Sequence, residues 1–442
     1  MLKRVSLLFS LSLLLAPSRL PAQSGLDGSW LLTTDVFGYP LHQRLTLEQK
    51  GESLTGKADS DKVEGTLKGS AVQFASKRDG GGSNEYTGTL SGDTMTGTVV
   101  LIDGDTGERV NSTFSAKRVP ERRAVAPQRH EFAPTTFYRR FSAETKPVLT
   151  IWPGDSVHTT TVDAGGTDEK GVTRVLGGNP QTGPFYVERA IPGDVLAVHI
   201  VRLRLNRDWA TSDDAVVSRA VDTGMAVKLK DTGKEVRWRL DRDKGIATPD
   251  KPAEHLKDYS VPLRPMLGCV GVAPGFAAAA PGTGDSGRYG GNMDFNGIVE
   301  GTTVYLQVRQ PGALLYVGDG HAVQGDGELN GNALETSMDV EFTVDLIPEK
   351  RITTPRVESP THIMAVGLDG SLEGALKDAT SGMAQWLEQD YSLTPSEVAQ
   401  VLGTASEIVI NEVADRNAGV VMRLSKDRLK PIPRTSAEKK SQ

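Results

Sequence analysis

Cysteine is almost absent from this chain of 442 residues, because Cys269 is the only one. No intrachain disulfide can therefore form, whichever compartment the protein occupies. Cys269 lies in the apolar segment 265–272, a composition typical of a buried strand, where a free thiol is inert. A nucleophilic cysteine is the alternative.

A strong charge of one sign and several catalytic motifs are also lacking. The net charge is only −6, and no basic stripe interleaves with aromatic residues, which argues against nucleic acid as a partner. The sequence contains no Gly-x-Ser-x-Gly elbow, no phosphate-binding loop and no His-Glu-x-x-His motif. It therefore gives no support for a nucleotide cofactor.

Long hydrophobic runs are absent except near the start of the chain. Lys3 and Arg4 precede an apolar run over residues 5–16, which is too short to cross a bilayer but within the range of a secretion signal. Ala22 supplies a small residue at the expected cleavage point. We predict a signal peptide over residues 1–22, a periplasmic or secreted protein, and no stable membrane insertion after cleavage. An uncleaved membrane anchor is the alternative.

Glycine, by contrast, is abundant at 48 residues, which predicts many tight turns and a β-rich fold. Residues 25–118 show period-two patterning broken by glycine and aspartate, and two similar segments, 65–69 and 88–92, each precede a strand-like stretch. This pattern predicts a small antiparallel barrel or sandwich. It holds no cluster of catalytic residue types, so we interpret it as a structural or interaction module.

The rest of the chain divides into a linker, a larger domain and a tail. Residues 119–131 contain prolines and arginines and predict a linker. Residues 132–425 contain many period-two strands and end with two helices, one over 372–387 and one that begins at a capping box in 394–397. The basic residues 426–442 predict a flexible tail.

The densest group of polar side chains lies between residues 318 and 328. Glycines separate its members and let a loop fold back, so that its acidic groups can converge. Aspartate, glutamate and histidine together suit zinc or another divalent ion. A calcium-binding or plain turn loop is the alternative, since Asp-Gly pairs favour tight turns. The members are Asp319, His321, Gln324, Asp326 and Glu328.

Two further clusters are candidates for the same site. Asn292 and Asp294 follow paired glycines that let the backbone approach a ligand closely, although a plain β-turn is the alternative. His362 precedes a strand-like segment, at a loop-to-strand junction where functional groups are frequent. A hydrogen-bonded structural histidine fits that position equally well.

These clusters give the chain a resemblance to the acetamidase/formamidase family over residues 134–424. The matching stretches occur in the family's order, at residues 182–188, 192–195, 271–274, 290–294, 311–314, 317–322, 324–328 and 358–362. The resemblance implies a β-rich α+β fold for residues 132–425, with a β-sandwich core and flanking C-terminal helices. Residues 25–118 lie outside it, as a small all-β module.

The resemblance also implies a chemistry and a set of site residues. The family hydrolyses short carboxamides, such as formamide and acetamide, to the acid and ammonia, and its members look metal-associated. For the ligands of a divalent ion, zinc or in the alternative calcium, it indicates Asp319, His321 and Asp163. The catalytic candidates are Asp294, Glu328, Asn292 and His362, and the substrate-binding candidates are Asn179, Gly183 and Gln324.

The predicted mechanism is hydrolysis of a small amide by metal-activated water. Glu328 or Asp294 acts as general base and later protonates the departing ammonia, and Asn292 donates a hydrogen bond to the developing oxyanion. Two other interpretations stay open: a secreted, non-catalytic β scaffold whose acidic loop holds calcium, and an amidase for a larger extracellular amide. A homo-oligomer is compatible with the sequence.

Overall fold

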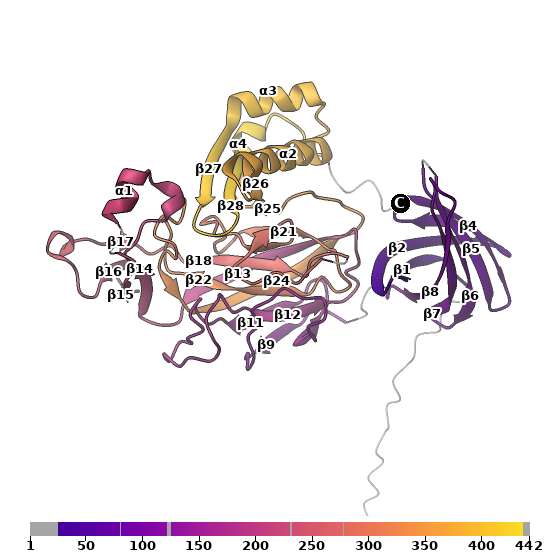
Figure 1. Ribbon diagram of the computed structural model, residues 1–442, viewed down its shortest axis with the longest axis horizontal. Helices are drawn as coiled ribbons and strands as arrows, with labels where there is room; N and C mark the ends of the chain where they lie inside the picture. The colour runs from indigo at the N-terminus through magenta and orange to yellow at the C-terminus, as the bar shows by residue number, and fades with distance from the viewer. Residues whose placement is uncertain (1–24, 80, 122–124, 230–231, 277, 436–442) are drawn as a thin grey trace, which may run out of the picture.

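The computed structural model describes residues 25–79, 81–121, 125–229, 232–276 and 278–435. They form an N-terminal barrel and a larger body that carries helices on one side (Figure 1). The expected signal peptide, residues 1–22, lies outside the described residues. Among the described helices, none is both long enough and apolar enough to cross a membrane.

Eight antiparallel strands close into the N-terminal barrel. Side chains alternate between its inside and its outside along each strand, so Trp30 and Leu32 are buried while Leu31 between them is half-buried. The interior is a separate apolar cluster, and the predicted all-β module is a barrel rather than a sandwich. Its strands are β1 (Gly28–Val36), β2 (Tyr39–Lys50), β3 (Ser53–Ala58), β4 (Asp61–Lys68), β5 (Ala71–Lys77), β6 (Ser83–Ser91), β7 (Thr94–Ile102) and β8 (Arg109–Arg118).

The two similar sequence segments of the barrel open with glycines that the strand packing requires. A Cβ atom on Gly65 would lie 2.2 Å from the carbonyl oxygen of Gln73, and one on Gly88 would lie 2.4 Å from that of Thr96. Glycine at these positions therefore lets neighbouring strands bend closely past each other, as barrel closure demands.

A few polar and aromatic contacts join the barrel to the body. Arg44 of β2 forms a salt bridge with the buried carboxylate of Asp194 in the body. Burial raises the pKa of Asp194, although the charge of Arg44 acts in the opposite direction. Tyr39 packs edge-on against Phe276 with 6.2 Å between the ring centroids. The barrel therefore lies beside the body loop that contains Phe276.

The first sheet of the body has eleven strands and contains the segment 315–321 at its centre. Its strand order is β17-β16-β15-β14-β23-β22-β18-β20-β19, while β12 pairs with both β22 and β10. The strands are β10 (Leu149–Ile151), β12 (Thr182–Val187), β14 (Trp209–Asp213), β15 (Glu235–Asp241), β16 (Ile246–Pro249), β17 (Val261–Pro262), β18 (Met266–Val272), β19 (Ser286–Gly287), β20 (Gly290–Asn292), β22 (Leu315–His321) and β23 (Glu335–Thr336).

The second sheet has nine strands in the order β27-β28-β26-β25-β21-β13-β24-β11-β9. They are β9 (Arg129–Phe132), β11 (Ser156–Thr160), β13 (Val195–Leu205), β21 (Thr303–Gln307), β24 (Met338–Ile347), β25 (Arg356–Glu358), β26 (His362–Asp369), β27 (Ser406–Glu412) and β28 (Ala418–Ser425). Val270 and Leu315 from the first sheet share one apolar cluster with Val198 and Val340 from the second. The β-rich α+β class is confirmed, and the sandwich arrangement of its core stays a prediction.

Two helices near the C-terminus confirm the helical pattern of the sequence. Ser371 caps α2 (Leu372–Tyr391), and Thr394 and Glu397 form the expected capping box of α3 (Pro395–Ala405). The buried side of α2 contributes Met383 and Trp386 to an apolar cluster with β26 and β28. The remaining helices are short: η1 (Ser218–Ala220), α1 (Thr223–Lys228), η2 (Glu254–Leu256) and α4 (Lys426–Leu429).

Parts of the predicted linker and tail contact the body. The linker runs into β9, which pairs in parallel with β11 from Arg129 onward. Within residues 426–435, Leu429 of α4 is buried and Arg434 lies 3.2 Å from Glu358. These two contacts join the start of the tail to the body, and the flexibility of the tail stays a prediction.

We predict that Gly367→Ala destabilises the body, because α2 lies directly on β26 at this glycine. A Cβ atom there would lie 1.9 Å from the carbonyl oxygen of Ala375 and 2.5 Å from the amide nitrogen of Ala379. Forcing the helix away should lower the free energy of unfolding by about 1–3 kcal/mol. Denaturant unfolding measures it, with Gly370→Ala as the control, since a Cβ atom on Gly370 would meet no heavy atom within 4 Å. Equal stabilities of the two variants would contradict this packing.

Candidate active site

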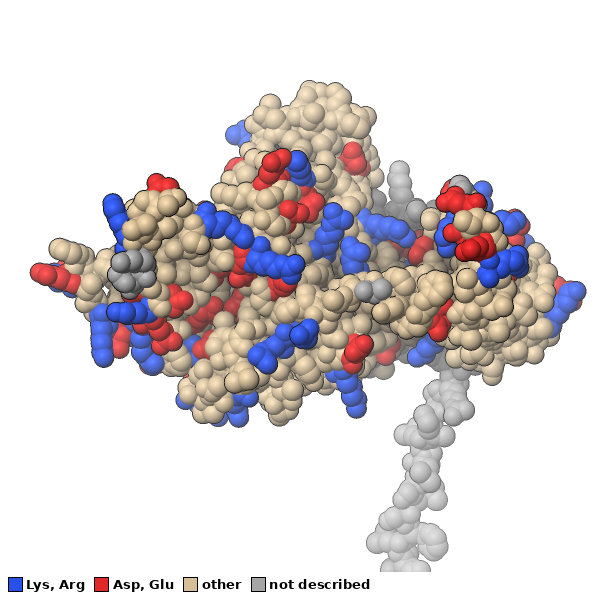
Figure 2. Space-filling model, in the orientation of Figure 1, with Lys and Arg blue, Asp and Glu red and all other residues tan. Residues whose placement is uncertain are grey.

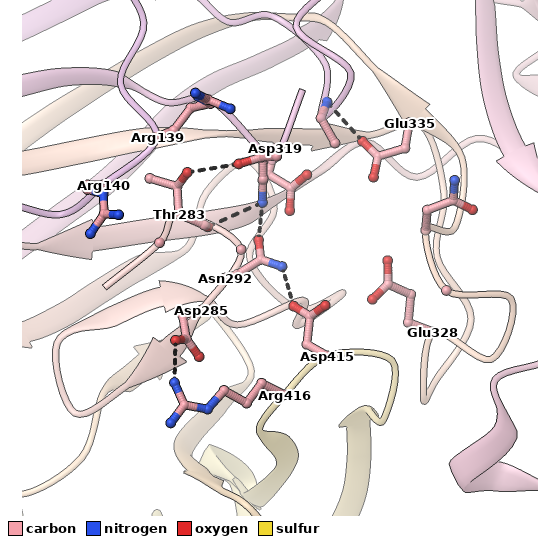
Figure 3. A pocket seen from close by; sticks show the side chains of 17 residues that line it. Arg139, Arg140, Thr283, Asp285, Asn292, Asp319, Glu328, Glu335, Asp415 and Arg416 are labelled. Atoms are coloured by element: carbon pink, nitrogen blue, oxygen red, sulfur yellow. Dashed lines mark hydrogen bonds and ion pairs between the residues drawn. The ribbon is translucent and has the colours of Figure 1, made fainter. Parts of the chain in front are cut away.

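A cavity of about 700 Å³ is lined by four of the ten predicted site residues, Asn179, Asn292, Asp319 and Glu328. Besides Asp319 of β22, its lining comes from five other parts of the body, within residues 139–140, 164–179, 282–292, 328–335 and 415–416. Figure 3 shows how the labelled side chains lie around it. Figure 2 shows acidic and basic side chains mixed over the visible face, in line with the modest net charge. The polar residues that line the cavity are Arg139, Arg140, Asn179, Thr283, Asp285, Asn292, Asp319, Glu328, Asn332, Glu335, Asp415 and Arg416.

The strand register explains why the two glycine-rich segments meet. Cys269 in the middle of β18 pairs with Asn292 of β20 on one side and with Gly318 of β22 on the other. The neighbouring Gly268 leaves the room that the carboxylates fill. A Cβ atom on Gly268 would lie 2.2 Å from Asp319 Oδ2 and 2.4 Å from Asp294 Oδ1. Because Gly268 on the buried strand β18 has no side chain, the carboxylates of Asp319 and Asp294 can lie against it.

Four predicted site residues adopt a left-handed backbone conformation that residues other than glycine rarely take. Such conformations cost on the order of 1–3 kcal/mol each and persist only where the surrounding structure enforces them, often at functional sites. Their φ angles are 57° for Asn179, 39° for Asp294, 58° for Asp319 and 48° for Glu328. The strain therefore coincides with the polar cluster.

Gln324 fixes the orientation of the His321 ring. The Gln324 Nε2 group donates to the carbonyl oxygens of Asp294 at 2.6 Å and Asn411 at 3.2 Å, so its Oε1 atom must be the acceptor for His321 Nδ1 at 2.8 Å. The ring consequently carries its hydrogen on Nδ1. Its Nε2 atom faces the carboxylates, which is how a second residue commonly prepares a histidine to bind a metal.

The Nε2 atom of His321 makes no hydrogen bond within the described part of the chain, although it is buried. It lies 3.4 Å from Asp319 Oδ1 and 3.4 Å from Glu335 Oε1. Two sets of ligand atoms converge there, Asp319–His321–Glu335 and Asp294–His321–Glu328, and the atoms of each set lie within 4.8 Å of one another. Asp294 Oδ1 also lacks a partner among the described residues. One nitrogen and several carboxylate oxygens fit a divalent cation.

Burial and mutual repulsion shift the acid–base properties of the cluster. Burial, and then the charges of Glu328 and Asp319, raise the pKa of Asp294 well above its usual value. Burial raises the pKa of Glu328 well above its ordinary value and that of Glu335 to about 7. For His321, burial favours the neutral ring, but the charges of Asp319 and Glu335 outweigh it and raise the pKa well above its usual value. A proton or a cation is therefore needed to offset the negative charge.

The Asn292 side chain connects other polar groups instead of facing an empty position. Its Nδ2 group donates to Asp294 Oδ2 at 2.7 Å and to Asp415 Oδ2 at 2.6 Å, while its Oδ1 atom accepts from Asn179. Both hydrogens of its amide are thus used. The prediction that Asn292 stabilises an oxyanion is corrected by this geometry, since a third acceptor has no hydrogen to take.

Two further predictions, for His362 and Asp163, change once the residues are placed. His362 pairs with Ser425, whereas Asp369, at the other end of β26, pairs with Ala418 close to the Asp415 loop. The seven-residue offset along an extended strand places His362 about 23 Å from that end, so His362 lies outside the site. Asp163 accepts from Arg207 Nη2 at 2.7 Å in a buried salt bridge, which argues against its role as a metal ligand.

The predicted substrate-binding residues also separate. Asn179 lines the cavity, whereas Gln324 orients His321 from behind. Gly183 is a buried strand residue that packs against β22 and does not line the cavity. A Cβ atom added to it would lie 2.6 Å from the carbonyl oxygen of Leu315.

Sequence reasoning missed Glu335 and the C-terminal loop. Glu335 reaches the site because β23 pairs with the end of β22, where Glu335 lies opposite His321. The loop after β27 holds the segment 324–328: the Gly327 amide donates to the carbonyl oxygen of Asn411, and the Val413 amide donates to that of Gly327. This contact delivers Asp415, whose pKa burial raises to about 6. A carboxylate seven positions beyond Glu328 was the only sequence signal for Glu335.

Two comparisons with known proteins point to one family. Residues 275–389 match the model of the Acetamidase/Formamidase family. A search of the curated proteins found no match.

Three solved structures are similar over most of the chain. One, described as a recombinant predicted acetamidase/formamidase from Thermoanaerobacter tengcongensis, shares 25% identity at a TM-score of 0.59 and covers 70% of this chain and 99% of its own. An acetamidase from Bacillus halodurans shares 26% identity at a TM-score of 0.56, and the match covers 68% of this chain and 99% of the acetamidase. An acetamidase from Yersinia enterocolitica shares 27% identity at a TM-score of 0.59, and the match covers 69% of this chain and 94% of the acetamidase.

We predict that Glu412→Gln flattens the dependence of stability on pH. Burial, followed by the charge of Asp415, raises the pKa of Glu412 from 4.5 to about 8 in the folded protein. Stability from a raised pKa is fully present below the unfolded value and is lost as pH rises through the folded value. Glu412 should therefore lower the free energy of unfolding by up to about 1.4 kcal/mol per pH unit within that window.

Denaturant unfolding at several values between pH 5 and 8 measures this slope. Glu407→Gln is the matched control, because Glu407 lies on the same strand with its side chain 54% exposed. The control should keep the wild-type slope. A Glu412→Gln slope equal to that of wild type would show that this carboxyl group ionises normally in the folded protein.

Proposed function

The chain belongs to the acetamidase/formamidase family, and we propose that it hydrolyses the carbon–nitrogen bond of a linear carboxamide. Water would add its oxygen to the carbonyl carbon, the carbon–nitrogen bond would break, and the nitrogen would leave as ammonia with a carboxylate as the other product. The observation that carries the proposal is the buried His321 Nε2 atom among several carboxylates beside a cavity.

Asp319, His321 and Glu335 are the residues that would hold a divalent ion. Asp319 and Glu335 line the cavity, and the Nδ1 hydrogen bond to Gln324 turns the Nε2 atom of His321 toward them. Zinc suits one histidine and two carboxylates, with calcium as the alternative for an oxygen-rich site. Such an ion supplies Lewis-acid polarisation of a carbonyl group.

Glu328 is our choice for the general base. It lines the cavity, it is 4% exposed, and burial raises its pKa well above the ordinary range, which makes its carboxylate a stronger base than an exposed one. As the carboxylate, Glu328 would take a proton from the attacking water and then pass it to the departing nitrogen. Asp294 is less suited, because it does not line the cavity and its Oδ2 atom is already bound by Asn292.

Asn332 takes the place that the sequence gave to Asn292 as a donor to the developing oxyanion. It lines the cavity, and its Oδ1 atom accepts from the Asp213 amide at 2.8 Å. This bond orients the side chain, and its Nδ2 group has no partner among the described residues. A donor of this kind contributes about 3 kcal/mol in comparable sites.

We predict that Glu328→Gln lowers only the rate of amide hydrolysis, whereas Asp319→Asn also lowers the metal content. Glu328→Gln should lower kcat/KM for propionamide by roughly 100- to 10,000-fold, because the general base is lost, while the metal content per chain stays at the wild-type value. Asp319→Asn should lower both the rate and the metal content. Ammonia release and elemental analysis of the purified proteins measure the two effects.

The matched control is Asp326→Asn, in the same loop but with an exposed side chain that faces Asn296. Its rate should stay within about twofold of wild type. If wild type releases no ammonia from formamide, acetamide, propionamide or longer amides with zinc or manganese supplied, the hydrolase proposal is wrong. Bound calcium without any turnover would favour a non-catalytic metal-binding scaffold.

We also propose that the protein is exported to the periplasm or beyond. The basic start and apolar run within residues 1–22 support this, and a disulfide-free fold with one buried cysteine is compatible with it. The expected result is a mature chain that begins at Gln23, measured by intact mass after expression with its own N-terminus. Full-length protein in the cytosol would contradict export.

A further inference from the structure

Two adjacent arginines, Arg139 and Arg140, line the cavity (Figure 3). Both residues are exposed. In the described part of the chain, neither side chain lies within ion-pair distance of a carboxylate. Arg416 on the same cavity differs, because it lies 3.0 Å from Asp285. The two guanidinium groups therefore add positive charge that no acidic side chain neutralises.

Two isolated antiparallel bridges to different segments hold the backbone around both arginines. Tyr138 bridges Gln181, and Arg140 bridges Gly282. The Thr283 amide donates to the carbonyl oxygen of Arg139 at 3.2 Å, and the Phe141 amide donates to that of Pro281 at 3.0 Å. The ring of Phe141 is fully buried in an aromatic cluster and anchors the end of the segment.

Each side chain is also tethered by one hydrogen bond. Nη1 of Arg139 donates to the carbonyl oxygen of Gly177 at 3.1 Å, and Nη1 of Arg140 donates to that of Ala280 at 3.2 Å. A guanidinium group has five N–H donors in a rigid fork, so most remain available. A held fork with free donors suits a carboxylate, which it can bind through two parallel hydrogen bonds.

The cavity is much larger than the smallest amides. Acetamide has four non-hydrogen atoms, which fill on the order of 120 Å³ at about 30 Å³ for each water-sized group. The cavity measures about 700 Å³, within the range of pockets that hold much larger ligands. Hydrolysis at Glu328 and Glu335 would leave the region beside the arginines for the rest of the substrate.

We propose that the substrates are amides that carry a carboxylate some bonds away from the amide, and that Arg139 and Arg140 bind this carboxylate. The inference rests on the proposed amide hydrolysis and names its substrate class. The reaction is unchanged: water attacks the amide carbon, ammonia leaves, and the second carboxylate takes no part in bond breaking. In Figure 3 the two arginines lie on the side of the view away from Glu328, and all three residues line the same cavity.

Three amides of similar length and different charge test this inference. Succinamate has a terminal carboxylate, butyramide a methyl group and β-alaninamide an ammonium group. Ammonia release from the full-length mature enzyme should give a kcat/KM for succinamate at least tenfold above that for butyramide. The preference should shrink as salt is added, because the arginines are exposed and screened.

Arg139→Ala together with Arg140→Ala should reduce the ratio of succinamate to butyramide by at least tenfold, mainly through a higher KM for succinamate. Arg139→Lys with Arg140→Lys should keep part of the preference, since a point charge remains without the planar fork. Arg78→Ala is the control, because it removes an exposed arginine of the barrel that does not line the cavity. This variant should keep the wild-type ratio.

The outcomes separate the inference from the proposed function. Release of ammonia from none of the three amides would overturn the hydrolase itself. Turnover of butyramide with no preference for succinamate, or a preference for β-alaninamide, would overturn only the carboxylate inference. A succinamate preference that survives the double alanine variant would also overturn the role of the two arginines.

Discussion

The burial of acidic side chains around one histidine is the constraint on which the rest of the site depends. Asp294, Asp319, Glu328 and Glu335 are each less than a tenth exposed. No lysine or arginine within the described ranges lies in ion-pair distance of any of them, so only His321 offers a nearby positive charge. Isolated buried carboxylates are costly and take up a proton or a cation instead. The site is thus built to hold positive charge that the chain does not supply.

The surrounding sheet keeps this unfavourable cluster in place. β22 is buried along its whole length, and its neighbours β18 and β23 fix the positions of Gly268 and Glu335 against it. Left-handed backbone at Asp319 and Glu328 adds strain. Strand pairing around β22 holds Asp319, and the hydrogen bonds of Gly327 with Asn411 and Val413 hold the loop that contains Glu328. Gln324 then binds two carbonyl groups, so the His321 ring cannot rotate without breaking hydrogen bonds. Strand pairing and hydrogen bonds around the cluster therefore hold the acidic side chains and His321 in their positions.

How much the sequence could predict depended on distance along the chain. The loop 318–328 and the pair Asn292 and Asp294 were found because their polar groups are contiguous and glycine-spaced. The same was true of α2 and α3, whose periodicity and capping box are local. Pairings between distant segments were not visible. Glu335 and Asp415 enter through the neighbours of β22 and the loop after β27, and neither carries a motif.

The predictions for Asp163 and His362 were wrong because they, too, depended on contacts between segments that are distant in the sequence. Asp163 stands in a motif that resembles the site, but Arg207, forty-four positions away, neutralises it. His362 precedes a buried strand as a functional residue often does, yet the direction of β26 carries it away from the loop that holds Asp415. Whether a polar residue is free or paired is decided by tertiary contacts, and its own sequence context carries little information on this point.

Charge is divided across the cavity between a buried acidic cluster and two exposed arginines. The acidic cluster is desolvated, so the repulsion between its carboxylates is strong and little screened by water, and a proton or cation offsets it. Arg139 and Arg140 stand in water at the other side, where their interactions are weaker but reach an approaching ligand first. A carboxylate bound there would not have to enter the acidic region, because only the neutral amide end needs to reach Glu328. The separation of a buried acidic end from an exposed basic one is therefore compatible with an anionic substrate, even though the protein as a whole is negatively charged.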